Sequence, residues 1–193
     1  MLLSGYQGDA PFVDPLCGSG TLPIEAAWIA LRRPPGLTRK RFGFMGWLDF
    51  EVEEWTALRD QARQGVKKRL EAPIAGSDIR RDALAFARRN ARAAGVGHLL
   101  SFELKDVADF RPPDGPPGII LCNPPYGERI GEEKELRQLY RTLGEVFRQR
   151  CAGWKLFVFT GNLSLARRLE MGPVRELALY NGRIPCKLLE FGR

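Results

Sequence analysis

The order in which short apolar runs and helical stretches follow one another constrains the fold of this chain most strongly. The apolar runs, each with the length of a strand, are residues 10–14, 73–78, 99–104, 118–122 and 154–160. The stretches with helical composition or periodicity lie between and after them, at 21–31, 51–70, 80–94, 132–150 and 163–169. Such an alternation predicts a mainly parallel sheet with helices on both faces.

The C-terminal part departs from this alternation and predicts a hairpin. Two further strands, at 174–180 and 184–191, flank Asn181-Gly182, which is a strong signal for a tight turn. A turn this short makes its two strands antiparallel. We therefore expect an α/β fold whose seven-stranded sheet is mostly parallel and contains one antiparallel strand. Residues 32–50, which carry Pro34-Pro35-Gly36, are expected to be irregular.

Composition narrows the class of protein. A length of 193 residues suits one domain, here residues 1–193, and the net charge of +7 is compatible with an anionic partner. The four cysteines form no CxxC pair and His98 is the single histidine, so we expect no metal. No apolar run reaches the roughly 20 residues of a membrane span, and no signal peptide is recognisable. We expect a cytoplasmic protein without membrane contact.

The first candidate site is the loop that follows the first strand, Asp14-Pro15-Leu16-Cys17-Gly18-Ser19-Gly20-Thr21. Two glycines let the backbone approach a ligand closely, and a helix that begins near Thr21 offers free amide groups. Pro23 occupies the place of the third glycine in the G-x-G-x-x-G pattern, which argues against a nicotinamide dinucleotide.

Two acidic residues follow the next two strands. Asp78 ends the second strand, where an acid in an α/β fold of this kind accepts hydrogen bonds from ribose hydroxyls. Asp106 follows the third strand and can meet an exocyclic amino group on adenine; the alternative is a helix cap. Both acids belong to the same predicted edge of the sheet, because ligands bind beyond the carboxyl ends of parallel strands.

The most informative motif is Asn123-Pro124-Pro125-Tyr126-Gly127, directly after the fourth strand. Consecutive prolines stiffen the chain and remove amide donors, so the segment presents the Asn123 side-chain oxygen and the Pro124 carbonyl as acceptors. Two acceptors in a rigid arc suit the two protons of an exocyclic amine, and Tyr126 offers a face for stacking a base. We predict Asn123, Pro124 and Tyr126 as the catalytic residues.

Together these motifs resemble the class I S-adenosylmethionine (SAM)-dependent methyltransferases, and most closely the THUMP-linked family that methylates guanine N2 in ribosomal and transfer RNA. The likeness rests on residues 14–22, Gly76-Ser77-Asp78, residues 123–129 and Tyr180-Asn181-Gly182-Arg183-Ile184. It implies a Rossmann-like fold, SAM as cofactor and ribosomal RNA as partner, and it leads us to expect the family's N-terminal RNA-binding THUMP domain to be absent from residues 1–193.

The resemblance also implies roles for single residues. Asp14, Gly18 and Gly20 would line the methionine half of SAM, within a loop that includes Cys17 and Thr21. Asp78 would hold the ribose, Asp106 would meet the adenine, and the Asn123 corner would hold the target amine beside the cofactor.

Three other functions fit parts of the sequence. An N6-adenine DNA methyltransferase would use the same Asn-Pro-Pro-Tyr corner. A non-catalytic RNA-binding module with a vestigial SAM pocket would not need the intact set of Gly18, Gly20, Asp78 and Asn123. A nicotinamide-dependent dehydrogenase is disfavoured by the missing third glycine and by the terminal hairpin.

Overall fold

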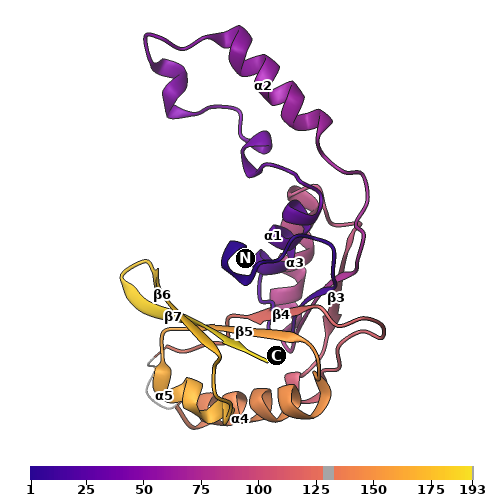
Figure 1. Ribbon diagram of the computed structural model, residues 1–193, viewed down its shortest axis with the longest axis vertical. Helices are drawn as coiled ribbons and strands as arrows, with labels where there is room; N and C mark the ends of the chain where they lie inside the picture. Colours follow the sequence, from indigo (N-terminus) through magenta and orange to yellow (C-terminus); the bar gives the residue numbers. More distant parts are fainter. Residues whose placement is uncertain (128–132, 193) are drawn as a thin grey trace.

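The computed structural model describes residues 1–127 and 133–192. One sheet holds seven strands in the order β3-β2-β1-β4-β5-β7-β6 (Figure 1). The strands are β1 (Phe12–Asp14), β2 (Ile74–Asp78), β3 (Leu100–Leu104), β4 (Ile119–Cys122), β5 (Lys155–Thr160), β6 (Arg175–Asn181) and β7 (Ile184–Phe191). The first five pair in parallel, and β7 runs antiparallel to both β5 and β6. The predicted mostly parallel sheet with one antiparallel strand is confirmed.

The described residues form five α-helices, and all except the second cover a face of this sheet, as predicted. They are α1 (Thr21–Ala30), α2 (Val52–Gln64), α3 (Arg81–Ala93), α4 (Glu133–Arg150) and α5 (Leu163–Ala166). Helices α1 and α3 pack on one face, and α4 and α5 lie on the other (Figure 1). Short 3-10 turns complete the chain: η1 (Leu2–Ser4), η2 (Pro35–Thr38), η3 (Gly43–Gly46), η4 (Val107–Asp109) and η5 (Arg167–Leu169).

Two apolar cores follow from these layers. In the core between α4 and the sheet, the hydroxyl groups of Tyr140 on α4 and Thr160 on β5 share a hydrogen bond of 2.9 Å. The polar end of the buried Tyr140 ring therefore has a partner inside the core. Gly144 lies so close to η5 that an added Cβ atom would approach the Leu169 carbonyl oxygen to 2.1 Å. The other core packs α1 against the sheet through Phe12, which is fully buried.

A protruding segment, residues 32–70, interrupts the chain between α1 and β2 and is called the arm below. It contains η2, η3 and α2 and extends away from the sheet and its helices (Figure 1). The amide of Lys67 donates to the Leu31 carbonyl at 2.8 Å, which closes the base of the arm. The predicted helix 51–70 is wrong in its last residues, because α2 ends at Gln64, Gly65 caps it, and the chain turns back toward β2.

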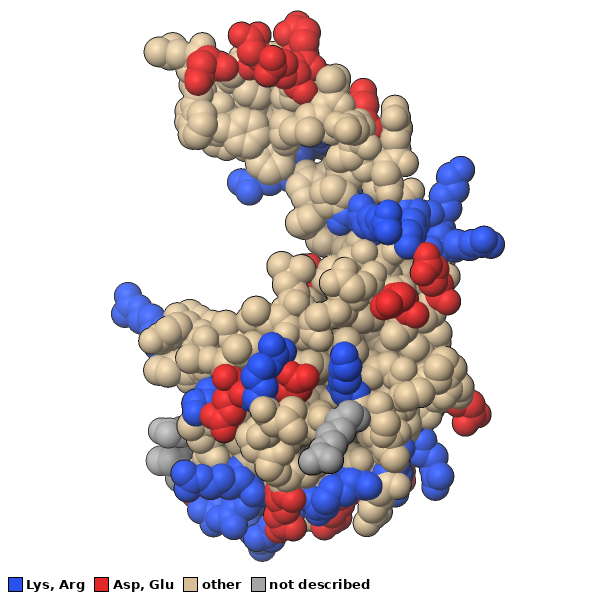
Figure 2. Space-filling model, in the orientation of Figure 1, with Lys and Arg blue, Asp and Glu red and all other residues tan. Residues whose placement is uncertain are grey.

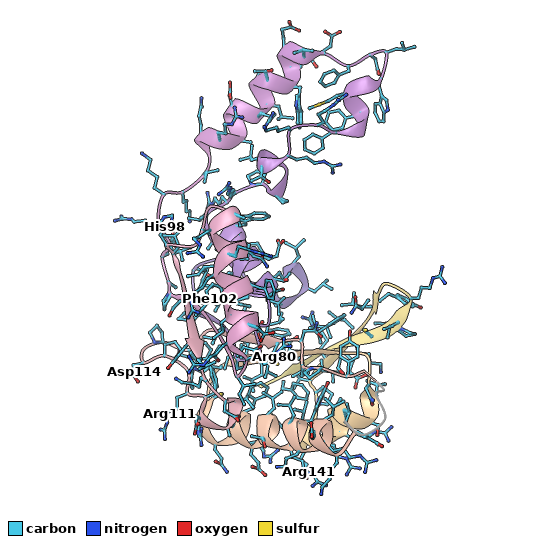
Figure 3. The ribbon with its side chains drawn as sticks, turned by 180° about the vertical axis from the view of Figure 1, so that it is seen from behind. Arg80, His98, Phe102, Arg111, Asp114 and Arg141 are labelled. Carbon is cyan, nitrogen blue, oxygen red and sulfur yellow. The ribbon has the colours of Figure 1, made fainter. Side chains whose placement is uncertain are left out.

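The arm joins the sheet at the end opposite the predicted site. It leaves from the C-terminal end of α1 and returns to the start of β2, whereas the predicted site follows the carboxyl ends of the strands. Figure 3 labels His98 and Arg80 at opposite ends of these parallel strands, His98 near the base of the arm and Arg80 where α3 begins. Among the described residues, none of the helices has the length and apolar character needed to cross a membrane.

Candidate active site

The loop after β1 is shaped by two glycines with different roles. Gly18 has φ 53°, and a Cβ atom added there would meet no atom within 4 Å, so its outer side is open. Gly20 has φ 84° and precedes the first residue of α1; an added Cβ would lie 3.0 Å from Ala87 of α3. Gly20 therefore permits close helix packing, while Gly18 leaves backbone accessible to a ligand. Thr21 is exposed at the start of α1.

Asp78 binds this loop directly. One carboxylate oxygen accepts the Gly18 amide at 2.9 Å, and the other accepts the Arg80 amide at 2.9 Å. The Cys17 amide donates to the Ser77 carbonyl at 2.8 Å, and the Ser77 hydroxyl donates to the Pro15 carbonyl at 3.4 Å, so three hydrogen bonds fasten the loop to the end of β2. Each carboxylate oxygen can accept about two hydrogen bonds, which leaves Asp78 capacity for further donors such as hydroxyl groups.

Asp14 is the most strongly buried acid of the site, with 2% of its surface exposed. Burial raises the pKa of its carboxyl group to about 8, the Leu16 amide hydrogen bond at 3.0 Å opposes this, and the nearby Asp78 charge adds to it. A cationic group beside Asp14 would favour its ionised form and so would lower this pKa. Burial, and next the Asp14 charge, raise the pKa of the Cys17 thiol, so this cysteine stays protonated at neutral pH.

Asp106 lies after β3 and acts as a cap in the structure. Its carboxylate accepts the Ala108 amide at 2.9 Å at the beginning of η4. Arg150 of α4 donates to the carbonyl groups of Ala108 at 2.7 Å and Phe110 at 3.0 Å, which fixes this turn against the helix. The cap that the sequence left as an alternative is thus present, and the exposed Asp106 keeps lone pairs for a ligand.

The Asn-Pro-Pro-Tyr corner follows β4, all of whose residues are buried. Asn123 is exposed, Pro124 is buried and Tyr126 is half-buried. The corner comes directly after the strand next to β1, so the predicted catalytic and cofactor residues follow the carboxyl ends of four adjacent parallel strands. The Glu128 and Arg129 part of the motif lies outside the described residues.

The C-terminal hairpin holds Tyr126 through contacts that the sequence alone did not reveal. The Asn181 side-chain amide donates to the Tyr126 hydroxyl at 2.8 Å, and the Cys186 sulfur lies 3.7 Å from the same oxygen. Gly161 permits the ring to lie close, because an added Cβ there would be 2.8 Å from a Tyr126 ring carbon. Burial, partly offset by the Asn181 hydrogen bond, raises the pKa of Tyr126.

Asn181 differs from its predicted place in the turn. It belongs to β6 and pairs with Ile184, so the turn consists of Gly182 and Arg183. Gly182 has φ 60°, which explains why glycine stands at this position. Within the described residues, no three His, Cys, Asp or Glu side chains cluster closely enough to hold a metal ion.

Comparisons with known proteins place this geometry in a family. A family model described as RMKL-like, methyltransferase domain, matches residues 1–190. A Synechocystis protein with the name "Putative RNA methyltransferase slr0064" is 37% identical over 191 residues, covering 99% of this chain and 50% of that protein. The ribosomal RNA large subunit methyltransferase K/L of Syntrophotalea carbinolica is 45% identical over 192 residues, covering 97% of this chain and 27% of that protein. The chain thus spans half or less of these two relatives.

Solved structures agree with the sequence matches. SMU.472, crystallised with SAH, superposes with a TM-score of 0.91 at 32% identity, covering 100% of this chain and 50% of that one. A predicted N6-adenine-specific DNA methylase from Listeria monocytogenes superposes with a TM-score of 0.86 at 34% identity, covering 100% and 49%. The family resemblance stated from the motifs is confirmed: this chain belongs to the RMKL-like methyltransferase domain family.

Proposed function

We propose that residues 1–193 form one SAM-dependent catalytic domain that methylates an exocyclic amino group of an RNA base, with N2 of guanine in ribosomal or transfer RNA as the target. The observation that carries the proposal is the exposed Asn123 at the end of β4, next to β1 and its glycine loop. The two relatives named as RNA methyltransferases support RNA as the substrate.

The residues present fit SAM. The open side of Gly18 would contact the methionine part, and the free amides at the start of α1 would donate hydrogen bonds to it. Asp14 would meet its cationic amino group. The spare lone pairs of Asp78 would accept the ribose hydroxyls, and Asp106 would accept from the adenine amino group. When bound, SAM supplies an electrophilic methyl group.

The chain's own residues then orient the substrate. The Asn123 side-chain oxygen and the Pro124 carbonyl would each accept a hydrogen bond from the target amine, which would orient its nitrogen toward the methyl group that SAM would supply. Tyr126, fixed by Asn181, stacks on the base. SAM would supply the methyl group that this nitrogen receives, and Asn123 and Pro124 would hold the nitrogen in place for the transfer. The methylated nitrogen is acidic and gives its proton to water, so a strong base is not needed.

The first experiment identifies the product. Purified protein and methyl-labelled SAM are incubated with undermodified ribosomal RNA, with transfer RNA and with unmethylated DNA, and the modified nucleoside is determined by mass spectrometry. N2-methylguanosine is expected. N6-methyladenine in DNA would instead support the second candidate, which the similarity to the Listeria protein favours. Absence of SAM binding in calorimetry would overturn both and restore the vestigial-pocket alternative.

Two substitutions test the residue roles separately. Asn123→Ala is expected to abolish transfer while SAM still binds, and Gln149→Ala, an exposed amide on α4, serves as the control. Asp78→Ala is expected to weaken SAM binding at least about tenfold, since it removes a charged hydrogen-bond acceptor. Asp82→Ala on the surface of α3 is its control. Unchanged turnover or unchanged affinity would remove the respective residue from its role.

The hairpin contact gives a third test. Asn181→Ala and Tyr126→Phe each remove one partner of the hydrogen bond of 2.8 Å, so each is expected to lower turnover, with unchanged SAM affinity. Because both remove the same bond, the double substitution should cost less than the two single losses combined. Fully additive losses would show that Asn181 does not act through Tyr126.

A further inference from the structure

The tip of the arm differs in charge from the rest of the chain. Residues 42–58 contain the acids Asp49, Glu51, Glu53 and Glu54 and no lysine or arginine, although the whole chain has a net charge of +7. Figure 2 shows these acidic side chains gathered at the far end of the arm, with basic side chains near its base. A phosphate backbone would be repelled at the tip, so this surface suits a cationic partner.

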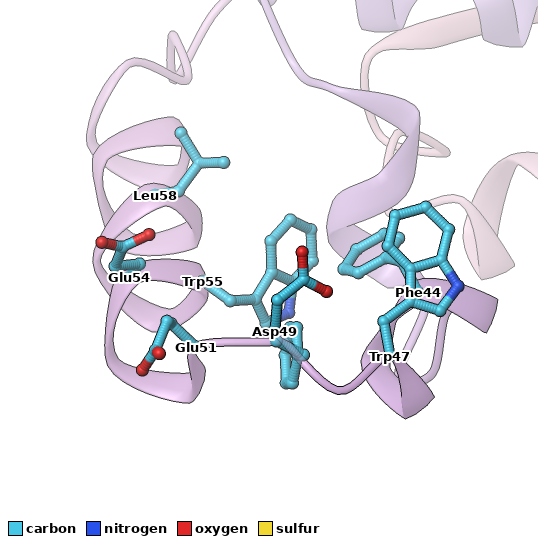
Figure 4. A pocket seen from close by; sticks show the side chains of 8 residues that line it. Phe44, Trp47, Asp49, Glu51, Glu54, Trp55 and Leu58 are labelled. Carbon is cyan, nitrogen blue, oxygen red and sulfur yellow. The ribbon is translucent and has the colours of Figure 1, made fainter.

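The same tip holds a cavity of about 460 Å³ with aromatic walls (Figure 4). It is lined by aromatic, aliphatic and acidic side chains: Phe44, Trp47, Asp49, Phe50, Glu51, Glu54, Trp55 and Leu58. Trp47 is 69% exposed and Leu58 is 56% exposed, so much of this apolar surface faces solvent. Exposed apolar surface with a polar rim is typical of an interaction site.

The arm already contains stacking of arginine guanidinium groups on aromatic rings, which is the kind of contact that such a site would make. The Arg39 guanidinium lies over the Phe42 ring, 5.1 Å from its centre, and Arg59 lies over Trp55 at 5.9 Å. The Phe42 ring stacks on Phe44, and the Trp55 ring meets Phe44 edge-on. Phe44 and Trp55 both line the cavity. A guanidinium arriving from outside could stack on the exposed Trp47 and pair with the carboxylates of the rim.

We propose that the arm cavity binds arginine side chains of a basic protein segment. The aromatic walls would take the flat guanidinium and the apolar stem, and Glu51 and Glu54 would accept its hydrogen bonds. Arginine fits better than lysine, because its planar group both stacks and forms paired hydrogen bonds. The arm leaves the sheet at the end opposite the carboxyl edge, so this site is separate from the candidate active site.

The test measures binding of a labelled peptide with four Arg-Gly repeats to the full chain by fluorescence anisotropy. Glu51→Gln with Glu54→Gln removes two cavity charges and is expected to weaken binding about tenfold, as expected for loss of charged hydrogen bonds worth about 1.4 kcal/mol. The matched control, Glu53→Gln with Asp60→Asn, removes two charges from exposed positions of α2 outside the cavity lining and is expected to have little effect. Trp47→Ala should also weaken binding.

Several results would overturn the proposal. They are failure of the arginine peptide to saturate the protein, equal binding of a Lys-Gly peptide, or equal losses in the two double variants, which would indicate unspecific charge attraction. If the cavity variants instead convert a dimer to a monomer in light scattering, the occupant is a second copy of this chain. If they weaken binding of an oligouridine RNA, the surface recognises nucleic acid. Circular dichroism confirms that each variant is folded, and the outcome does not depend on methyl transfer.

Discussion

Replacing Asp14 by asparagine tests whether the buried Asp14 carboxyl group makes the stability of the protein depend on pH. The pKa of Asp14 is raised from 3.8 to about 8, with burial as the largest cause. The folded protein therefore keeps Asp14 protonated across a pH range in which the unfolded chain has lost the proton. Because the folded state binds the additional proton, the free energy of unfolding has its full value below about pH 4 and falls as the pH rises to about 8.

The size of this loss follows from the pKa difference. Roughly 1.4 kcal/mol per pH unit gives about 4 kcal/mol between about pH 5 and pH 8, and about 6 kcal/mol as an upper limit over the whole range. Asparagine keeps the carbonyl oxygen that accepts the Leu16 amide but does not titrate. Asp14→Asn should therefore show a much flatter dependence of stability on pH than the unsubstituted protein.

Urea unfolding followed by circular dichroism, without SAM, measures this difference at several pH values. The surface variant Asp82→Asn is the control and should follow the unsubstituted protein, because Asp82 is exposed. If the curves for Asp14→Asn and the unsubstituted protein run parallel from pH 5 to pH 8, Asp14 does not titrate in this range and its assigned environment is wrong.

Two further predictions concern the core beneath α4. Gly144→Ala should lower the free energy of unfolding by about 1–3 kcal/mol or more despite the better helix propensity of alanine, because the new methyl group would collide with the Leu169 carbonyl. Gly172→Ala is the control, because a Cβ atom added at Gly172 would meet no atom within 4 Å. Equal stability of the two variants would contradict the close packing at Gly144. Tyr140→Phe should cost about 1–3 kcal/mol, since it leaves the buried Thr160 hydroxyl with one partner fewer, and thermal denaturation that matches the unsubstituted protein would refute this.

The sheet and its carboxyl edge were predictable because local patterns determine them. A buried strand such as β4 appears as a continuous apolar run, and the candidate residues lie at the ends of the predicted strands or in the loops that follow them. The support of Tyr126 by Asn181 was not predictable, since the two residues are 55 positions apart and Asn181-Gly182 signals only a turn. The cofactor and substrate roles of the candidate residues stay predictions.

The arm was not predictable for a different reason. Its aromatic residues between Phe42 and Trp55 follow neither a helical nor a strand period, so residues 32–50 indicated only irregular structure. Helix α2 has no buried residue in the structure. Its sequence did not predict which part of the chain it contacts. The ring centres of Phe44 and Trp55 lie 5.0 Å apart. This contact arises from the chain reversal at η3, which local sequence patterns do not encode.

The open sheet has consequences for the behaviour of the protein at high concentration. Strand β6 ends the sheet on one side, and the unpaired peptide groups of such a border can recruit another chain into an aggregate. Two ion pairs cross from β7 to this border: Arg175 with Glu190 at 2.7 Å and Lys187 with Glu176 at 2.5 Å. A foreign strand that docked there would have to lie beside fixed charges, so the border resists fibril-like stacking while the protein remains folded.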